Sequence, residues 1–388
     1  MKSGLLRRTL LQIHLWVGLV AAIPLILIGL SGSALLAQRE ILYLSVPQAR
    51  QGPSQPVAAM VAAAERAMDN KFQASWIELP QSAGRPASVQ FDVSRRPRRT
   101  VSLYVDPVSL QILGAPTEVM RRGPITTFLV NIHEFLMMPQ HYGLQIVGLF
   151  GVILVLMSLS GLILWWPRAG QWGNGQWKSW FFVTRGTRGF KFHFDLHHAV
   201  GIWGFLLLFF LGFSGIYLTF PLSFGEAVKT VLPTNDIPPP DVRRISIAWP
   251  HDIDEAISLA RATLPDARVT GVQLPHRNVS RYGVQMEAPG LSSSFPQLLL
   301  SFDASEPGVV SVDDPAAYSA ADRFSNMQYA LHFAVGMGPL WTFLVFLSGL
   351  VPAILAVTGL AVWWQRRSAR RRAQALEGQI GLTSAANG

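Results

Sequence analysis

Four long apolar segments set the strongest limit on how this chain can fold. They run about from Leu10 to Ala37, Gly143 to Trp166, His198 to Leu222 and Gly338 to Trp364. Each is long enough to cross roughly 30 Å of hydrocarbon as an α-helix. Half of the residues are hydrophobic and only 14% are charged, which favours a membrane protein over a soluble chain of two or three domains. The sequence therefore predicts an all-α four-helix bundle in a membrane.

Basic residues predict the orientation of these spans. They gather before the first span, between the second and third spans, and after the fourth, where Arg366 and Arg367 follow Trp363 and Trp364. Short flanks rich in Lys and Arg stay on the cytoplasmic side. We therefore expect a multi-pass membrane protein with both termini cytoplasmic. The net charge of +9 is then a signal of topology, and no nucleic-acid partner is expected.

The two long connections lie on the other side of the membrane in this topology, and they share one order of elements. The first predicts a helix over Val57–Lys71 and strands over 74–79, 87–93 and 100–105. The second predicts a helix over 252–264, starting near Asp252 or Asp254, and strands over 268–274, 282–287 and 297–302. Each connection is thus expected to form an α+β module outside the membrane.

The predicted organisation follows from these elements. It comprises the N-terminus and first span (1–37), the first module with a ligand helix (38–142), the second span (143–166), a cytoplasmic interfacial loop (167–196), the third span (197–222), the second module with a ligand helix (223–337), the fourth span (338–364) and a basic cytoplasmic tail (365–388).

An internal repeat relates the two halves. The first span carries His14, Gly18, Gly29, Ser31 and Gly32, and the third carries His197, Gly201, Gly212, Ser214 and Gly215, each 183 residues later (197 − 14, 215 − 32). The second and fourth spans are related by Gly151, Gly161 and Trp165, which match Gly349, Gly359 and Trp363. This pattern predicts a tandem repeat of span, module and span.

The histidines of the repeat predict a haem site. An imidazole in an apolar span is costly unless something uses it, and a b-type haem takes one axial imidazole on each side of its ring. His14 and His197 are expected to bind an inner haem, with His198 as the reserve ligand. The chain has no cysteine, which excludes covalent attachment of haem through a Cys-x-x-Cys-His motif.

A second pair of histidines lies nearer the outer surface. His133 precedes Trp165 by about 48 Å of helix and His332 precedes Trp363 by about 46 Å, more than the hydrocarbon thickness. His133 and His332 are therefore expected at the outer interface, binding a second haem, with His141 as the rival to His133. A packing role is the alternative for any one histidine.

Glycines beside the inner histidines allow two interpretations. Gly18 and Gly201 lie one turn beyond His14 and His197 on the same helix face, where a flat macrocycle could approach the backbone. Small residues also let membrane helices pack closely whatever the cofactor. For the glycines of the Gly-x-Ser-Gly motif, packing is the favoured interpretation.

The spans and modules together resemble the PepSY-associated transmembrane family. The resemblance rests on the histidine and glycine spans, on the segment from Ser160 to Arg168 (SGLILWWPR) and on the outer modules. The family includes iron-regulated inner-membrane proteins and ferric siderophore reductases such as ferrioxamine B reductase. It implies PepSY-like modules, two non-covalent b-type haems on His14, His197, His133 and His332, and an enzyme that reduces a periplasmic ferric siderophore to release Fe(II).

The electron donor and a competing function remain open at this point. Some relatives fuse a flavin and nicotinamide reductase domain, and this chain has none up to Gly388, so we expect a separate cytoplasmic reductase or a quinol as donor. The alternative is a non-enzymatic PepSY-type envelope regulator or peptidase inhibitor. Nothing in the sequence names the siderophore, its binding residues or the oligomeric state.

Overall fold

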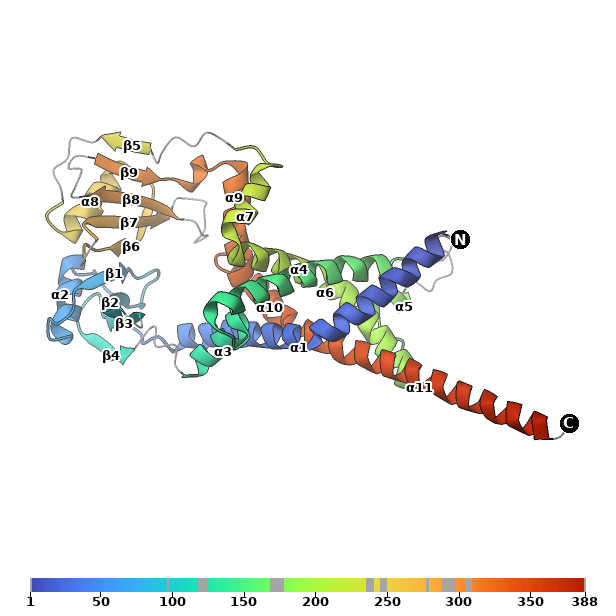
Figure 1. Cartoon of the computed structure of the whole chain (residues 1–388). Helices are drawn as coiled ribbons and strands as arrows, with labels where there is room; N and C mark the ends of the chain where they lie inside the picture. The colour runs from blue at the N-terminus through green and yellow to red at the C-terminus, as the bar shows by residue number, and fades with distance from the viewer. Residues whose placement is uncertain are drawn as a thin grey trace. The chain divides into compact units, whose positions relative to one another are not determined.

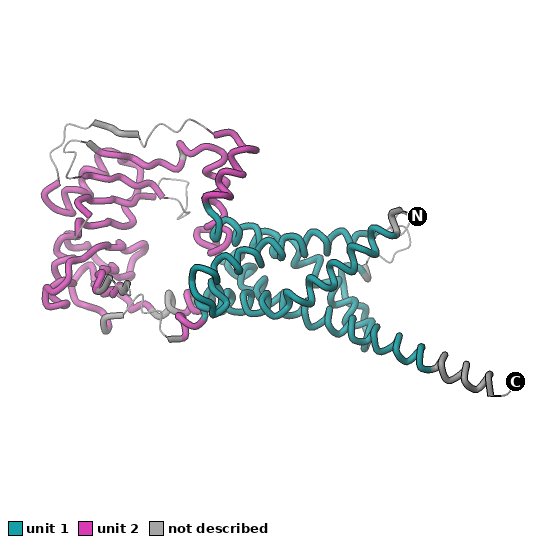
Figure 2. Tube along the Cα trace, viewed as in Figure 1, with its two compact units in different colours: residues 1–36, 129–221, 339–388 teal, residues 37–128, 222–338 magenta. Residues whose placement is uncertain are grey.

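The computed structural model describes residues 2–95, 98–117, 124–167, 178–234, 241–244, 250–276, 279–287, 297–303 and 309–386. The chain divides into two compact units (Figure 2). Unit 1 comprises 1–36, 129–221 and 339–388, and unit 2 comprises 37–128 and 222–338.

Unit 1 is helical and contains all four predicted spans. Its helices are α1 (Lys2–Ser45, which continues into unit 2), α3 (Pro124–Phe135, from Leu129), α4 (Gln140–Trp165), α5 (Lys178–Phe181), α6 (Gly189–Thr219), α10 (Gly338–Ser348) and α11 (Val351–Ala386). The segments long and apolar enough to cross a membrane are Leu5–Arg39, Gln140–Trp165, Gly189–Thr219 and Gly338–Ala375. The four spans are confirmed, and the basic tail continues the last one as a helix.

The spans have the polarity of a membrane bundle, with apolar side chains outside and small polar ones inside. Val20 and Leu156 are 78% and 59% exposed, whereas Ser214 and Ser348 are 0% and 1% exposed. The buried hydroxyls bond to backbone carbonyls, as Ser348 Oγ does to Val345 O at 2.6 Å. Lipid-facing surface must be apolar, and buried polar groups need internal partners.

Close glycine contacts join the spans in two related places. On one side, a Cβ added at Gly29 in α1 would lie 2.5 Å from the carbonyl oxygen of Gly349, at the turn between α10 and α11. On the other, a Cβ added at Gly212 in α6 would lie 3.1 Å from the carbonyl oxygen of Gly151 in α4. These are the repeat-related glycines, so packing, the favoured interpretation, accounts for them.

The basic flanks of the first and fourth spans gather with the end of the second. Arg7 donates to the carbonyl oxygens of Leu164 at 2.5 Å and Trp166 at 3.2 Å, which close α4. Trp16 of α1 lines the same pocket as Trp363 of α11. These basic segments therefore lie at one end of the bundle, as the topology requires. That this end faces the cytoplasm stays a prediction, and residues 168–177 of the predicted interfacial loop lie outside the described residues.

Unit 2 is built on one antiparallel sheet of nine strands (Figure 1). The strands are β1 (Ala74–Glu78), β2 (Ala87–Arg95), β3 (Arg98–Val105), β4 (Ile112–Thr117), β5 (Asp241–Arg244), β6 (Arg268–Gln273), β7 (Arg281–Glu287), β8 (Leu298–Asp303) and β9 (Val309–Asp313). Their order is β4-β3-β2-β1-β6-β7-β8-β9-β5. The helices are α2 (Val57–Ala67), α7 (Pro221–Lys229), α8 (Ile253–Thr263) and α9 (Ala320–Phe333), with a 3₁₀ turn at Pro315–Ala317.

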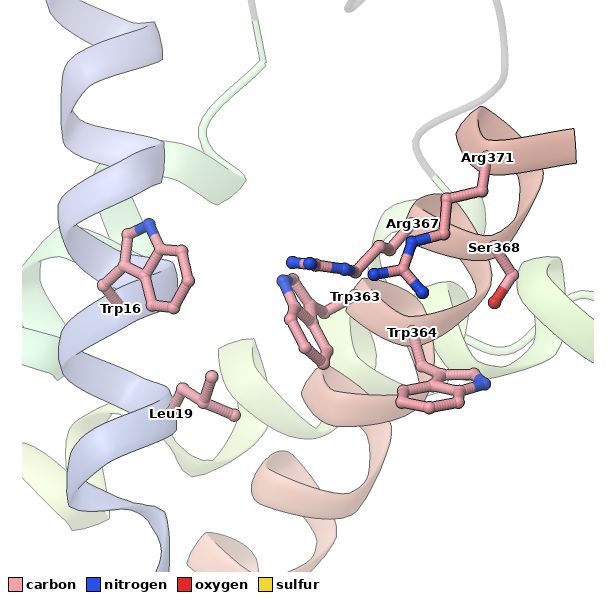
Figure 3. A pocket seen from close by; sticks show the side chains of 7 residues that line it. All are labelled: Trp16, Leu19, Trp363, Trp364, Arg367, Ser368 and Arg371. Carbon is pink, nitrogen blue, oxygen red and sulfur yellow. The ribbon is translucent and has the colours of Figure 1, made fainter. Parts of the chain in front are cut away.

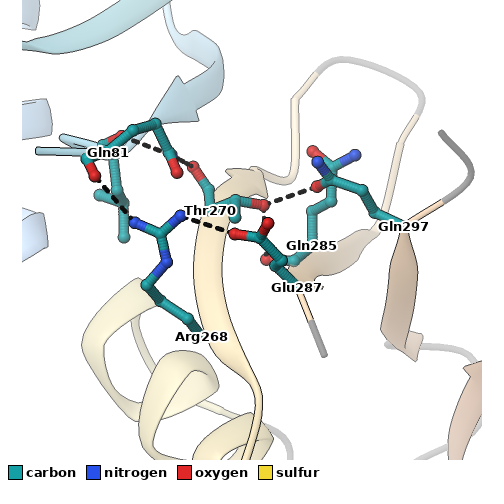
Figure 4. A network of polar contacts seen from close by, with 7 residues as sticks. Gln81, Arg268, Thr270, Gln285, Glu287 and Gln297 are labelled. Carbon is teal, nitrogen blue, oxygen red and sulfur yellow. Dashed lines mark hydrogen bonds and ion pairs between the residues drawn. The ribbon is translucent and has the colours of Figure 1, made fainter. Parts of the chain in front are cut away.

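The two expected modules are therefore one structure. Strand β1 of the first half pairs antiparallel with β6 of the second, with Ile77 opposite Val272. Side chains across this seam add a polar network (Figure 4), in which Arg268 donates to Gln81 O at 3.1 Å and pairs with Glu287 at 2.6 Å. Helices α2 and α8 pack on strands of their own halves and on each other. One hydrophobic core with Phe91 and Leu300 runs through both halves.

The predicted elements differ from the observed ones mainly at their ends and at the sheet edges. Asp252 caps α8 as expected, accepting a hydrogen bond from the Glu255 N–H at 2.8 Å. Helix α2 ends at Ala67, four residues early, because Asp69 and Asn70 have positive φ angles of 55° and 53°. Strands β4, β5 and β9 were not predicted, and His133 belongs to unit 1 instead of the first module.

Candidate functional site

His14 is held by the second span. Its Nδ1 lies 2.8 Å from Ser160 Oγ on α4. The hydroxyl proton of Ser160 is directed to the carbonyl oxygen of Met157 at 3.1 Å, so the hydroxyl accepts from Nδ1–H. The next residue, Gly161, lies beside the ring, because a Cβ there would be in ordinary van der Waals contact with His14 Cε1, at 3.5 Å. This tautomer leaves the Nε2 lone pair available as a ligand.

His197 is held by the fourth span in the same way. Its Nδ1 lies 3.0 Å from Thr358 Oγ1 and 3.1 Å from the carbonyl oxygen of Leu355 on α11. A carbonyl can only accept, so Nδ1 carries the proton here also. Gly359 follows Thr358, and a Cβ on it would lie 3.3 Å from His197 Cε1.

These two histidine sites are equivalent by the internal repeat. Ser160 and Thr358 are 198 residues apart (358 − 160), the same offset as Gly161 and Gly359. The imidazoles of His14 and His197 lie close enough to interact electrostatically. No hydrogen bond joins Nε2 of either ring to another of the described residues. In metal-bound histidines, one ring nitrogen donates a hydrogen bond to an oxygen and the other ring nitrogen binds the metal.

This donor set fits a b-type haem. Two neutral imidazoles from two different helices are what six-coordinate haem iron takes. The glycines beside them do not form an open slot, because a Cβ at Gly18 would lie 2.9 Å from Met157 Cε and one at Gly201 would lie 3.8 Å from Leu355 Cδ2. Gly18 and Gly201 therefore contact neighbouring spans. The structure does not support the expectation that they face a macrocycle.

His133 lies on α3 and packs against the first span. Its Nδ1–H donates to the carbonyl oxygen of Ile28 at 2.8 Å, and a Cβ on Gly32 would lie 2.7 Å from its Cε1. Burial lowers the pKa of His133, while the hydrogen bond to Ile28 opposes that shift, so the neutral form that binds metal is favoured. Gly32 therefore admits this imidazole.

The predicted partner of His133 belongs to the other unit. His332 lies in the last turn of α9 and contacts the ring of Phe333, with ring centroids 5.6 Å apart. Because the two histidines are in different units, their pairing stays a prediction.

The reserve histidines have other surroundings. The His198 ring lies on Phe194, with centroids 4.2 Å apart, and contacts a different set of residues from His197. His141, at the start of α4, is exposed and contacts Tyr142 edge-on. Neither ring shows the anchored Nδ1 of His14, His197 and His133 among the described residues.

Comparison with known proteins places the chain in a family. The family model described as the PepSY-associated TM region matches residues 11–366, which reach from the first span into the fourth and contain both halves of the sheet. The chain belongs to the PepSY-associated transmembrane family. A related protein of Pseudomonas aeruginosa, described only as uncharacterised, is 26% identical over 268 residues, covering 63% of this chain and 64% of its own length. The match thus spans less than two thirds of that relative.

The sequence did not predict the roles of two polar residues of this PepSY-associated protein. Ser160 and Thr358 anchor the inner histidines, yet each is one of many hydroxyl residues in the spans. Their signal in the sequence is that each directly precedes a matched glycine, Gly161 or Gly359, at the same repeat offset.

Proposed function

We propose that this protein is a di-haem b electron-transfer protein of the inner membrane, and an enzyme that reduces a periplasmic ferric siderophore and releases Fe(II). The observation that carries the proposal is the equivalent pair formed by His14 and His197. Each has its Nδ1–H bonded to an oxygen on a neighbouring span, and each presents Nε2. A packing histidine has no need of this arrangement twice, at repeat-related positions.

The residues would act by holding and orienting the cofactor. His14 and His197 would hold the inner haem, while Ser160 and Thr358 fix the tautomer and the ring planes of these histidines. His133 and His332 would hold the outer haem, as the family resemblance implies. Haem iron cycles between Fe(III) and Fe(II), so two such groups give single electrons a route across the bilayer.

The chemistry of the substrate suits one-electron transfer. Siderophores hold Fe(III) with hard oxygen ligands that bind Fe(II) much less well. One electron added to the chelated Fe(III) would give Fe(II), which would dissociate while the chelator stays intact. A separate cytoplasmic reductase or a quinol would supply that electron.

A difference spectrum of the purified protein tests the cofactor. We expect the dithionite-reduced minus oxidised spectrum to show the α-band of low-spin haem, with two haems per chain. His14→Ala should lower the haem content by about half, because one ligand of one haem is lost. His251→Ala is the matched control, since His251 is exposed and belongs to unit 2.

Activity is tested with a ferric siderophore and a coloured Fe(II) chelator. We expect Fe(II) release from reduced wild-type protein and a loss of that release in His14→Ala. A spectrum without a haem band, or Fe(II) release by haem-free protein, refutes the proposal.

A further inference from the structure

A pocket lies at the basic end of unit 1, between the first and fourth spans. Its volume is about 410 Å³, within the range of about 300 to 1,000 Å³ of small-molecule sites. Trp16 and Leu19 line it from α1, and Trp363, Trp364, Arg367 and Arg371 line it from α11. Figure 3 shows the residues of α1 facing those of α11 across this space.

Two positive charges of the pocket lack an anionic partner. Arg367 and Arg371 are one helical turn apart and both are exposed. Arg367 lies over the Trp363 ring, with Cζ 5.5 Å from its centroid, and no carboxylate among the described residues pairs with either guanidinium. Like charges four residues apart on a helix repel each other. An anion bound between them would remove that repulsion.

Apart from Ser368, the rest of the lining is apolar and aromatic. Three indole rings and the Leu19 side chain form an apolar wall of the pocket, suited to contact with hydrocarbon. The two guanidinium groups beside this wall are suited to bind an anion. Tryptophan and arginine at the end of a spanning helix occupy the headgroup level of a bilayer. The occupant should therefore be amphipathic, with an anionic oxygen group and an apolar body.

We propose that this pocket binds the headgroup of an anionic phospholipid. Phosphate oxygens would accept hydrogen bonds from Arg367 and Arg371, and the acyl chains would run along Leu19 and the outer face of the spans. Basic pockets between membrane helices bind such headgroups, and each arginine near an anionic lipid contributes measurably to affinity. This site is independent of haem and of the proposed reductase activity.

Native mass spectrometry of the full chain in detergent tests the proposal. The probes are phosphatidylglycerol and phosphatidylcholine of matched acyl chains. We expect one tightly bound phosphatidylglycerol per chain and clear preference over phosphatidylcholine. The double variant Arg367→Gln with Arg371→Gln should weaken phosphatidylglycerol binding about thirty-fold, as expected from the loss of two arginines near a lipid phosphate.

Two neighbouring arginines provide a matched control. Arg370→Gln with Arg372→Gln removes the same charge from the same helix, but neither residue lines the pocket. We expect this variant to bind phosphatidylglycerol within about three-fold of wild type, since only general surface charge is lost. Equal weakening in both double variants, equal binding of the two lipids, or a co-purified quinone in place of phospholipid would overturn the assignment.

Discussion

The hydrogen bonds to the inner histidines predict unequal effects of two similar substitutions. Ser160→Ala leaves the Nδ1–H of His14 with no acceptor, because Ser160 Oγ is its hydrogen-bond partner among the described residues. An unsatisfied buried donor costs about 1–3 kcal/mol. Thr358→Val leaves the Leu355 carbonyl in place at 3.1 Å from His197 Nδ1. Thr358→Val should therefore cost only about 0.5–1 kcal/mol, the net contribution of one hydrogen bond, because the donor keeps another acceptor.

These energies translate into haem affinity, on the proposed function. Loss of a hydrogen bond that orients a metal ligand weakens binding by about 10- to 100-fold. We expect Ser160→Ala to fall in that range and Thr358→Val to fall below about ten-fold. The assay is haem transfer from the purified protein to excess apomyoglobin, followed by the change in the Soret band. The inner haem should leave faster in Ser160→Ala, while the outer haem leaves at the wild-type rate.

A third serine controls for the loss of a hydroxyl. Ser158 lies two residues from Ser160 on α4 and is buried, and its hydroxyl donates to the carbonyl oxygen of Leu154 at 2.8 Å without touching a histidine. Ser158→Ala should leave both haems at wild-type rates. The reasoning is refuted if Thr358→Val releases haem as fast as Ser160→Ala, or if Ser158→Ala matches either of them.

Three further predictions concern two close glycine contacts and one buried carboxylate. Gly349→Ala should lower the melting temperature and yield in detergent, because its Cβ would overlap the Gly29 carbonyl, a backbone clash costing about 1–3 kcal/mol. Gly32→Ala should displace the His133 ring, whose Cε1 would lie 2.7 Å from the new Cβ, and remove the outer haem alone from the difference spectrum. Acid should destabilise unit 2 through Asp106, measured by urea unfolding between pH 5 and pH 2.5, about the range where a carboxyl with a lowered pKa titrates.

The sign of the acid effect follows from the surroundings of Asp106. Burial alone would raise its pKa, but backbone N–H groups of Ser109, Val108 and Arg50 donate to the carboxylate and hold the pKa below its usual 3.8. The stabilisation is therefore complete above the usual value and is lost as the pH falls through the folded pKa. Asp106→Asn should flatten this part of the pH profile, and an unchanged slope would contradict the reasoning.

The glycine predictions have controls in the same chain. Gly225→Ala in α7 meets no atom within 4 Å, so stability should be unchanged or slightly higher. Gly161→Ala would place its Cβ 3.5 Å from His14 Cε1, an ordinary contact, and should be tolerated far better than Gly32→Ala. Loss of the outer haem in Gly161→Ala as well would show that contact with His133 is not the cause of the loss in Gly32→Ala.

Some features were predictable because the sequence encodes them locally. A span is a composition over some twenty residues, and the four spans appear where hydropathy places them. The cap at Asp252, strands β1 to β3 of the first half and strands β6 to β8 of the second half follow from short patterns. Strand β5 was missed because its sequence, DVRR, carries no alternation of apolar residues.

Other features depend on contacts that no local pattern carries. The pairing of β1 with β6 joins Ile77 to Val272, 195 residues apart (272 − 77) and so half of the chain, and two modules were therefore expected where one sheet exists. One acceptor for His197 is the carbonyl of Leu355, which every residue type offers equally. The histidines could be found from their repeat, whereas the atoms that fix their tautomer emerge only from the fold.

The pairing of β1 with β6 also has a consequence for how the protein is made. The first half of the sheet is synthesised long before residues Gly271 to Gln273 of β6. Until β6 is made, the edge of β1 that pairs with it has no partner strand. An unpaired edge adds a strand from any neighbouring copy. A nascent chain halted before the third span is thus a candidate for strand exchange between two copies. Completion of the second half covers that edge, so the order of synthesis determines how long β1 is open to strand exchange.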